Sequence, residues 1–582
     1  MRKQKLKSRT SLIQGLCFLV FGLIVIQLFR LQVLNHKLYA TKANQQQIMK
    51  STIFAKRGEI YFLDGDTPVP IVMNKKTYTI SIDPSLVVKK REEITKKIDE
   101  IVGAYRVKTG WDEVFADPER KYFVVAKNVP YTETNNLKKA DLVGVYEQET
   151  TTRVYPEGEM AAQVLGFVNQ DGEGQYGVEG SLNKELTGEN GLLKTVKDSN
   201  NVPLTIGNEN VKIPAKDGKN LVLTIDRNIQ KKAEESVDEV TKKFNITYGS
   251  AIVMNPATGQ ILAMAGKPGY NPAEYAKVTD AKVFQTDVTM NAFNPASVCK
   301  TFAIAAAIDS GVMTPETTYY NTDRLVIDGW PIENAIKGHT GEISMQTVLT
   351  YSVNTGSIQA LKLLGGSASE ITYQGKEKLY DYYHNRFNLG KYTGIELPET
   401  KGSIVPPNDI DATDARYANI TFGQSSDLSI IQVASAFSAV VNGGEYYRPT
   451  LIAGEMKDGK FVRTELAKAD HDALNKNDTS RTMRQMLHTG RLVFPNVKGY
   501  DEDYYVGGKT GTAQTVKNGK YSFDETIGTY VGFGAKSLEE TPDYVIMTKV
   551  WSDNRKLDGG MNAKPIFDEI SKYMINYNKV RR

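Results

Sequence analysis

The stretch N-P-A-S-V-C-K-T-F-A-I-A-A-A-I-D-S-G, Asn294 to Gly311, combines an almost wholly apolar helical pattern with one lysine. An isolated charge is costly to bury, so Lys300 is expected to have a function. Ser297 lies three residues before it, and residues at this spacing share one face of a helix. Cys299 points about 200° away from Ser297, so we expect its thiol among core side chains.

Serine is a nucleophile only when a base removes its proton, and a lysine amine is a base only when burial and a nearby positive charge lower its pKa. We therefore predict that Lys300 is the base for Ser297. The second charge is predicted to be Lys509, in the G-G-K-T-G-T of an expected strand. Between these motifs S-V-N, Ser352 to Asn354, follows a short helical run and supplies a further hydroxyl and an amide.

The hydrophobic pattern around these motifs predicts an α+β domain with a mainly antiparallel sheet flanked by helices, because strands at both ends of the domain enclose a helical middle. The expected elements are a strand at 221–226, a helix at 227–244, a hairpin turning at 255–259, three strands within 504–516, 526–536 and 543–551, and a helix at 565–577. Before residue 215 the pattern is looser, with a strand at 77–83 and a charged helix near Lys90.

The first ten residues carry five basic side chains and no acid, and an apolar run from Leu12 to Leu28 follows. Extended through Leu31, this run approaches the length that spans a bilayer, and no A-x-A cleavage site follows it. We expect a retained anchor, with the basic end in the cytoplasm and the remainder outside. The rest of the chain is close to neutral, which argues against nucleic-acid binding.

Metal and disulfide chemistry are not expected. The two cysteines, Cys17 and Cys299, fall in the predicted membrane span and in the extracytoplasmic part, and the five histidines are scattered without a ligand spacing. The sequence therefore predicts no metal and no cofactor.

The order S-x-x-K, S-x-N, K-T-G-T is that of serine β-lactamases and penicillin-binding proteins. With R-G-E-I at 57–60, R-V-Y-P at 153–156 and G-V-E-G at 177–180, the chain resembles a class B penicillin-binding protein, a membrane-anchored peptidoglycan D,D-transpeptidase, over nearly its whole length. It departs from the usual motifs at P-A-S-V-C-K, where P-G-S-T-F-K is common, and at the L-D-G-D that follows R-G-E-I. These motifs are shared by enzymes of elongation, division and sporulation.

The resemblance implies a penicillin-binding, serine β-lactamase-like transpeptidase domain preceded by an elongated pedestal domain and a transmembrane helix. The expected ranges are a cytoplasmic tail at 1–11, the anchor at 12–34, a pedestal or dimerisation-like domain at 35–215 and the transpeptidase domain at 216–582.

The resemblance also assigns roles. Ser297 is expected to attack the penultimate D-Ala carbonyl of a stem peptide, with Lys300 as base and Ser352 relaying the proton to the leaving D-Ala. The substrate-binding residues are expected to be Asn354, Lys509, Thr510, Gly511 and Thr512. The amides of Ser297 and Thr512 are expected to form the oxyanion hole.

The implied partners are D-Ala-D-Ala stem peptides, β-lactams, a SEDS-type membrane glycosyltransferase and a cell-wall synthesis complex, and the implied location is the bacterial cell membrane, single-pass, with the catalytic domain outside. Two alternatives remain open. A β-lactamase or D,D-carboxypeptidase would use the same motifs with water, for which Glu396 in G-I-E-L-P-E is the only hint of a base. A β-lactam-binding sensor or non-catalytic scaffold would keep the fold.

Overall fold

The computed structural model describes residues 2–37, 48–117, 120–196, 211–475, 477–494, 504–517 and 520–580. The expected pedestal range therefore includes two stretches, 38–47 and 197–210, that lie outside the described residues. The chain divides into two compact units, one made of residues 1–57 and 187–218 and the other of residues 58–186 and 219–582.

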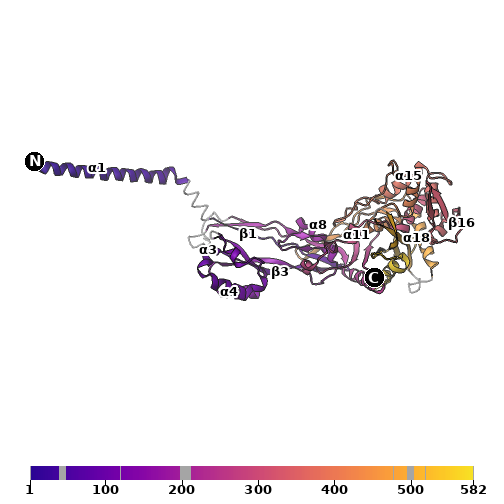
Figure 1. The fold of residues 1–582 in the computed structure, drawn as a ribbon, viewed down its shortest axis with the longest axis horizontal. Helices are drawn as coiled ribbons and strands as arrows, with labels where there is room; N and C mark the ends of the chain where they lie inside the picture. The colour runs from indigo at the N-terminus through magenta and orange to yellow at the C-terminus, as the bar shows by residue number, and fades with distance from the viewer. Residues whose placement is uncertain are drawn as a thin grey trace. The chain divides into compact units, whose positions relative to one another are not determined.

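The first unit begins with the long helix α1 (Arg2–Phe29), followed by the short π-helical η1 (Arg30–Leu34) (Figure 1). Among the described residues, one helical segment, Thr10–Leu34, is long and apolar enough to cross a membrane. The same unit contains an antiparallel three-stranded sheet of β1 (Ile48–Ile53), β8 (Gly191–Val196) and β9 (Val211–Ile213).

The second unit contains a seven-stranded sheet whose strands come from both the expected pedestal range and the expected transpeptidase range. β2 (Ile60–Asp64) pairs in parallel with β10 (Asn220–Asp226), and β10 pairs on its other side with β18 (Ile452–Lys457). β19 (Lys460–Arg463) completes that side. Strands from both expected domains thus share one set of backbone hydrogen bonds.

On the pedestal side, the sheet carries a lobe whose core is closed by two amphipathic helices. The side chains of Ile94 and Ile98, on one of these helices, and of Ile80 and Val125, on the strands, are at most 2% exposed. Their burial follows from the apolar face of the helix and from the alternation of apolar residues along the strands. The lobe consists of β3 (Thr67–Ile82), β4 (Phe123–Val129), β5 (Val145–Val154), α4 (Arg91–Val102) and α6 (Tyr131–Lys139).

Shorter elements lie within the lobe and along the chain between the lobe and β10. They are α3 (Pro84–Val87), α5 (Trp111–Val114), α7 (Ala162–Leu165), β6 (Phe167–Val168), β7 (Gly174–Gln175), α8 (Gly177–Ser181) and α9 (Asn183–Thr187). The side chain of Arg153 in β5 is buried and donates from Nε to Glu179 of α8 at 2.8 Å and from Nη1 to Asn74 of β3 at 2.9 Å, which ties the R-V-Y-P and G-V-E-G motifs together.

The C-terminal part of the second unit is built on an antiparallel five-stranded sheet of order β12-β11-β23-β22-β21. Its strands are β11 (Tyr248–Met254), β12 (Ile261–Lys267), β21 (Tyr505–Lys517), β22 (Lys520–Ala535) and β23 (Tyr544–Trp551). The expected hairpin and the three late strands are confirmed. The edges β12 and β21 come from the two ends of the domain, as predicted.

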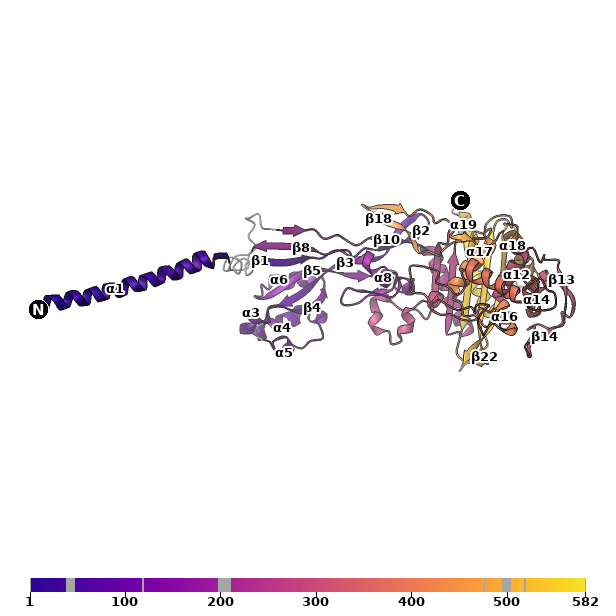
Figure 2. The ribbon, with the colours of Figure 1, turned by 90° about the horizontal axis from the view of Figure 1, so that it is seen from above.

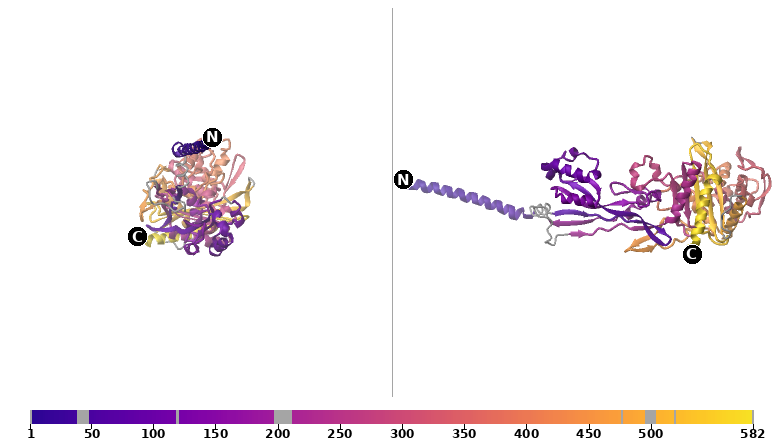
Figure 3. Two further views of the ribbon diagram at one scale, coloured as in Figure 1. Left: turned by 90° about the vertical axis from the view of Figure 1, so that its left-hand side faces the viewer. Right: turned by 90° about the horizontal axis from the view of Figure 1, so that it is seen from below.

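Both faces of this sheet are covered because alternate residues of its strands are apolar on both sides. Ala251 and Val253 face one buried cluster, whereas Ile252 and Met254 face another. α10 (Arg227–Phe244) and α19 (Lys564–Val580) pack on the first face. In the right-hand view of Figure 3 the yellow α19 lies along the strands.

The second face packs against a helical region that contains Ser297 and Lys300 and is seen beside β22 in Figure 2. Its helices are α11 (Asp287–Met290), α12 (Lys300–Asp309), α13 (Met345–Tyr351), α14 (Asn354–Leu364), α15 (Tyr373–Tyr380), α16 (Asp414–Thr421), α17 (Ile430–Val441) and α18 (Asn477–Leu492). Its hairpins pair β13 (Thr318–Asn321) with β16 (Gly341–Ser344), β14 (Arg324–Ile327) with β15 (Trp330–Glu333), and β17 (Glu445–Tyr446) with β20 (His471–Asp472).

The stretch Asn294 to Gly311 is not one continuous helix, which corrects the prediction. Ala296 has φ +59°, in the left-handed region that alanine rarely adopts, and a 3₁₀ turn, η6 (Ala296–Cys299), precedes α12. Ala296 lies tightly against Gly423, where any Cβ would come within 2.1 Å of the Ala296 carbonyl oxygen. The backbone therefore turns sharply just before Ser297.

Candidate active site

Ser297 and Lys300 meet at the junction of η6 and α12. Lys300 is fully buried, and its Nζ lies 2.7 Å from the Ser297 Oγ. Ser297 itself is half-buried, so its hydroxyl borders both the core and the surface. The spacing of three residues brings nucleophile and amine together although the turn between them is 3₁₀ rather than α.

Ser352 contacts the same amine from a second element. It follows α13 with φ +61°, and Lys300 Nζ lies 2.8 Å from its carbonyl oxygen and 3.1 Å from its Oγ. A neutral amine has two hydrogens and one lone pair. With one hydrogen committed to the carbonyl, the lone pair can accept the proton of one serine hydroxyl while the other hydroxyl accepts a hydrogen bond. This arrangement suits a base placed between two hydroxyls.

Two buried lysines shape the electrostatics of the site. Burial holds the pKa of Lys300 well below its ordinary value, and the positive charge of Lys509 lowers that pKa further. Lys509, on β21, is 4% exposed, and burial lowers its pKa to about 7, against the opposing effect of the Asp558 carboxylate. Burial and the positive charge of Lys509 therefore both favour the neutral form of the Lys300 amine.

β21 is brought close to the nucleophile by glycine. A Cβ at Gly511 would lie 2.3 Å from Thr529 Oγ1 and 2.7 Å from the carbonyl oxygen of Pro295, so only glycine fits between the strand and the turn. Thr529 also donates from Oγ1 to the Pro295 carbonyl at 3.3 Å. The K-T-G-T segment thus lies directly beside the turn that carries Ser297.

A cavity of about 360 Å³ adjoins these residues. Its wall includes Ser352, Lys509 and Thr510, together with apolar side chains of α13 and α18 and the turn η9 (Gly559–Ala563) that precedes α19. The cavity therefore places an open volume next to Ser352 and Lys509.

Thr512 and Asn354 are engaged within the protein. Thr512 Oγ1 donates to Asp558 Oδ2 at 3.1 Å and accepts from the Gly559 amide at 3.2 Å. Asn354 Nδ2 donates to the carbonyl oxygen of Glu333 at 2.7 Å, at the end of the β14–β15 hairpin. A ligand that used either group would have to share or replace these hydrogen bonds.

The side chains of Cys299 and Glu396 are not available as a nucleophile or a base, because the first is buried and the second is already hydrogen-bonded. Cys299 is fully buried, burial raises the pKa of its thiol, and its carbonyl accepts from the Tyr383 hydroxyl at 2.9 Å. Glu396 accepts from Thr450 Oγ1 at 2.7 Å and from the Leu451 amide at 2.8 Å, so both carboxylate oxygens hold the segment that leads into β18. Among the described residues, no group of three His, Cys, Asp or Glu side chains is arranged to hold a metal ion.

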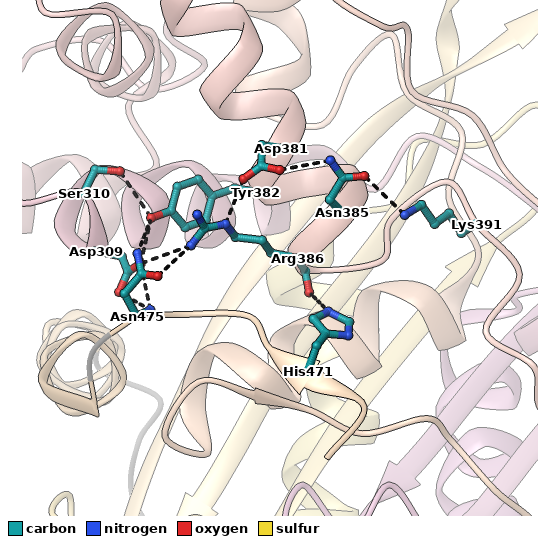
Figure 4. Close-up of polar contacts among 9 residues, drawn as sticks. All are labelled: Asp309, Ser310, Asp381, Tyr382, Asn385, Arg386, Lys391, His471 and Asn475. Carbon is teal, nitrogen blue, oxygen red and sulfur yellow. Dashed lines mark hydrogen bonds and ion pairs between the residues drawn. The ribbon is translucent and has the colours of Figure 1, made fainter.

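The far end of α12 is fixed by a buried carboxylate. Figure 4 shows Asp309, whose side chain is fully buried, surrounded by donors from other elements. It accepts from the Tyr382 hydroxyl at 2.7 Å, from the Asn475 amide at 3.0 Å and from Thr479 Oγ1 at 3.1 Å, and Arg386 lies 3.9 Å away. Because Thr479 begins the helix that packs on β21, this carboxylate links the Lys300 helix to the helix behind Lys509.

Asp309→Asn is expected to lower the free energy of unfolding by about 3 kcal/mol, because the new amide would face donors and leave buried groups unsatisfied. Denaturant unfolding followed by tryptophan fluorescence measures the loss. The control is Asp381→Asn in the same network, whose carboxylate is 45% exposed and pairs with Arg386 at 2.8 Å. That exposed pair should change stability by less than about 1 kcal/mol. Equal losses of unfolding free energy in the two variants would mean that the Asp309 carboxylate does not fix the end of α12.

Sequence reasoning missed several of these residues. Asp558 and Gly559 lie in a D-G-G turn that could have been marked as a turn, but nothing local relates that turn to Thr512, more than forty positions earlier. Asn354 donates to the backbone carbonyl oxygen of Glu333, and the residue type at position 333 does not indicate such a contact. Asp309 could have been flagged as an acid at the end of an apolar helix.

Comparisons with known proteins are consistent with this geometry. A family model described as "Penicillin binding protein transpeptidase domain" matches residues 249–572, and one described as "Penicillin-binding Protein dimerisation domain" matches residues 52–223. The chain is 29% identical over 522 residues to stage V sporulation protein D of Bacillus subtilis, covering 88% of this chain and 77% of that protein. It is 26% identical to the peptidoglycan D,D-transpeptidase FtsI of Buchnera aphidicola subsp. Schizaphis graminum, covering 97% and 95%.

Solved structures show the same fold. A peptidoglycan synthetase from Bifidobacterium adolescentis aligns with a TM-score of 0.70 at 20% identity, over 92% of this chain and 97% of that one. Penicillin binding protein 3 from Mycobacterium tuberculosis, solved in complex with aztreonam, aligns with a TM-score of 0.66 at 22% identity, over 91% and 98%.

Proposed function

The chain belongs to the family of penicillin-binding proteins with a transpeptidase domain, and from that premise we propose which of its residues perform the reaction. The protein is a serine-type peptidoglycan D,D-transpeptidase, which acts on stem peptides and is a target of β-lactams. The observation that carries the residue assignment is the buried Lys300 amine, 2.7 Å from the Ser297 hydroxyl and 3.1 Å from that of Ser352.

In the proposed acylation, the Ser297 hydroxyl gives its proton to the neutral Lys300 amine while its Oγ bonds to the carbonyl carbon of the penultimate D-Ala. The amides of Ser297 and Thr512 hold the resulting oxyanion. The peptide C–N bond then breaks, and Ser352 passes a proton to the departing D-Ala nitrogen. Lys300 supplies that proton, so the base returns to its neutral form.

In the proposed second half, the amine of another stem peptide enters where the D-Ala left and attacks the acyl-enzyme. Its proton returns through Ser352 and Lys300 to the Ser297 oxygen. A β-lactam acylates Ser297 in the same way, but its leaving nitrogen stays tethered to the acyl group and blocks the acceptor. Asn354, Lys509, Thr510, Gly511 and Thr512 are the proposed substrate-binding set, with Lys509 as the cation for the terminal carboxylate.

Intact-mass measurement after exposure to benzylpenicillin tests this function. We expect the mass of one penicilloyl group, persisting for at least many minutes. Release within seconds would favour a β-lactamase or carboxypeptidase, and the absence of any adduct would favour a scaffold. Both carboxylate oxygens of Glu396 already accept hydrogen bonds, so Glu396 is poorly placed to activate water, which supports transpeptidation over hydrolysis.

The helix Thr10–Leu34 and the family resemblance are consistent with membrane anchoring. We extend the proposal to a bacterial single-pass protein with a cytoplasmic tail at 1–11, an anchor at 12–34, a pedestal at 35–215 and an extracytoplasmic transpeptidase domain at 216–582. Accessibility of single introduced cysteines to a membrane-impermeant reagent in intact cells distinguishes this topology. Labelling at position 410 but not at position 4 is expected.

The proposed partner is a SEDS-type membrane glycosyltransferase that binds the pedestal. The lobe carries exposed apolar side chains, among them Tyr131 at 64% and Val143 at 67% exposure, which suit a contact surface. A photo-crosslinking residue at position 143 should capture the glycosyltransferase in cells. The control position is Ile410, 97% exposed in the transpeptidase domain, and preferential capture there would contradict the proposal.

A further inference from the structure

Asp558 lies at the mouth of the substrate-binding region. It immediately precedes η9 and lines the same cavity as Ser352, Lys509 and Thr510. Its side chain is exposed, and Oδ2 accepts the hydrogen bond from Thr512 Oγ1 at 3.1 Å. A negative charge therefore sits beside two groups that the proposed function uses to bind another negative charge.

The hydrogen bonds around Thr512 show what this contact does. A hydroxyl has one hydrogen to donate and two lone pairs to accept with. The Gly559 amide donates to Thr512 Oγ1 at 3.2 Å, and the single hydroxyl hydrogen goes to Asp558. A substrate carboxylate can only accept, so it receives no hydrogen bond from Thr512 unless Asp558 gives one up.

The carboxylate of Asp558 is not free to drift away from the strand. Oδ1 accepts from the Gly560 amide at 2.7 Å and from the Met561 amide at 3.0 Å. A Cβ at Gly559 would lie 2.3 Å from the Gly511 carbonyl oxygen and 2.4 Å from that of Thr529, so the turn is docked against the strand with no spare room. The competing charge is a fixed part of the site.

We propose that Asp558 is a specificity-determining residue which competes with the terminal carboxylate of the acyl donor for Thr512 and for the field of Lys509. The inference rests on the proposed function of that site. Because Asp558 competes with the donor's terminal carboxylate, the preference for donors that end in a carboxylate over donors with an uncharged group at this position is smaller than Lys509 alone would produce.

The test compares two acyl donors on the full-length protein in detergent at pH 5, far enough below the wild-type Lys509 pKa of about 7 that Lys509 stays protonated when the Asp558 charge, which raises that pKa, is removed. Second-order acylation rates are measured for benzylpenicillin and for its methyl ester, which lacks the negative charge. Comparing the ratio of the two rates between wild type and variant removes differences in ring reactivity and in the protonation of Lys300. Asp558→Asn should raise the ratio of acid rate to ester rate about three- to tenfold, while the ester rate stays within about twofold.

Two further variants make the result specific. Asp558→Ser removes the charge but keeps an oxygen that can accept from the Gly560 and Met561 amides, so it should raise the ratio even if Asp558→Asn misfolds. The matched control is Asp524→Asn, an exposed aspartate 3.9 Å from Lys556, which should leave the ratio unchanged. An unchanged or lower ratio in both Asp558 variants would overturn the inference. If neither compound acylated the wild-type protein, the proposed function itself would fall.

Discussion

Ser297→Ala should abolish covalent labelling by a fluorescent penicillin, with a loss of acylation rate of about 10⁴-fold or more. The reason is that, in the proposed reaction, the Ser297 oxygen forms the bond to the acyl group. Ser352 contacts the Lys300 amine too, but its Oγ lies farther away, at 3.1 Å against 2.7 Å. Labelling is measured by gel fluorescence and by intact mass.

Cys299→Ser is the matched control, because it changes a neighbouring nucleophile-like side chain by one atom. The thiol is fully buried and burial raises its pKa, so the thiolate is disfavoured and the variant should label at close to the wild-type rate. Loss of labelling in a folded Cys299→Ser protein, or retained labelling in Ser297→Ala, would show that the nucleophile has been misassigned.

Lys300→Arg should lower the acylation rate by about 10³-fold, within the range contributed by a general base. The variant keeps the positive charge, but a guanidinium does not give up its proton in the working pH range and is too large for a fully buried site. The rate constant for acylation by benzylpenicillin, from stopped-flow or quenched gel assays, measures the effect. A variant within tenfold of wild type would mean that Lys300 is not the base.

Lys509→Arg provides the comparison, because a guanidinium can still bind a carboxylate, so a milder loss of about tenfold is expected.

The pH profile of the wild type separates the two lysines. Acylation should rise with pH as Lys300 loses its proton, at a pKa well below the ordinary lysine value, and should fall as Lys509 loses its proton near pH 7. In Lys509→Arg the falling limb should disappear. Equal losses in both arginine variants would mean that the roles are exchanged.

Much of the transpeptidase sheet could be predicted from the sequence because its strands are short apolar runs separated by turns. The hairpin that turns at 255–259 and the strand that holds Lys509 lie where the hydrophobic pattern predicts them. The helix at 227–244 was also predictable, since Asp226 caps it by accepting from the amides of Asn228 and Ile229. These elements could be predicted because interactions between residues close in sequence determine them.

The site was only partly predictable for the same reason. The spacing of Ser297 and Lys300 is local, and the structure brings the two together as expected. The turn at Ala296 was not foreseen, because the left-handed backbone there is imposed by contact with Gly423, which is distant in sequence. Asp558 was missed because its partner, Thr512, is reached only through the packing of η9 on β21. Such pairings depend on tertiary structure that no local pattern encodes.

The sheet shared by pedestal and transpeptidase domain has a consequence for the order in which the chain folds. β2 finds its parallel neighbour β10 only after roughly 160 further residues have been made, and β10 waits for roughly 230 more before β18 arrives. Contacts so far apart in sequence form slowly, and until they form the edges of β2 and β10 are open to wrong partners. In the proposed topology, in which the part of the chain after the anchor is translocated, these strand edges must be kept from neighbouring chains until most of the chain has emerged, so the interval after translocation would be the period of greatest exposure to aggregation.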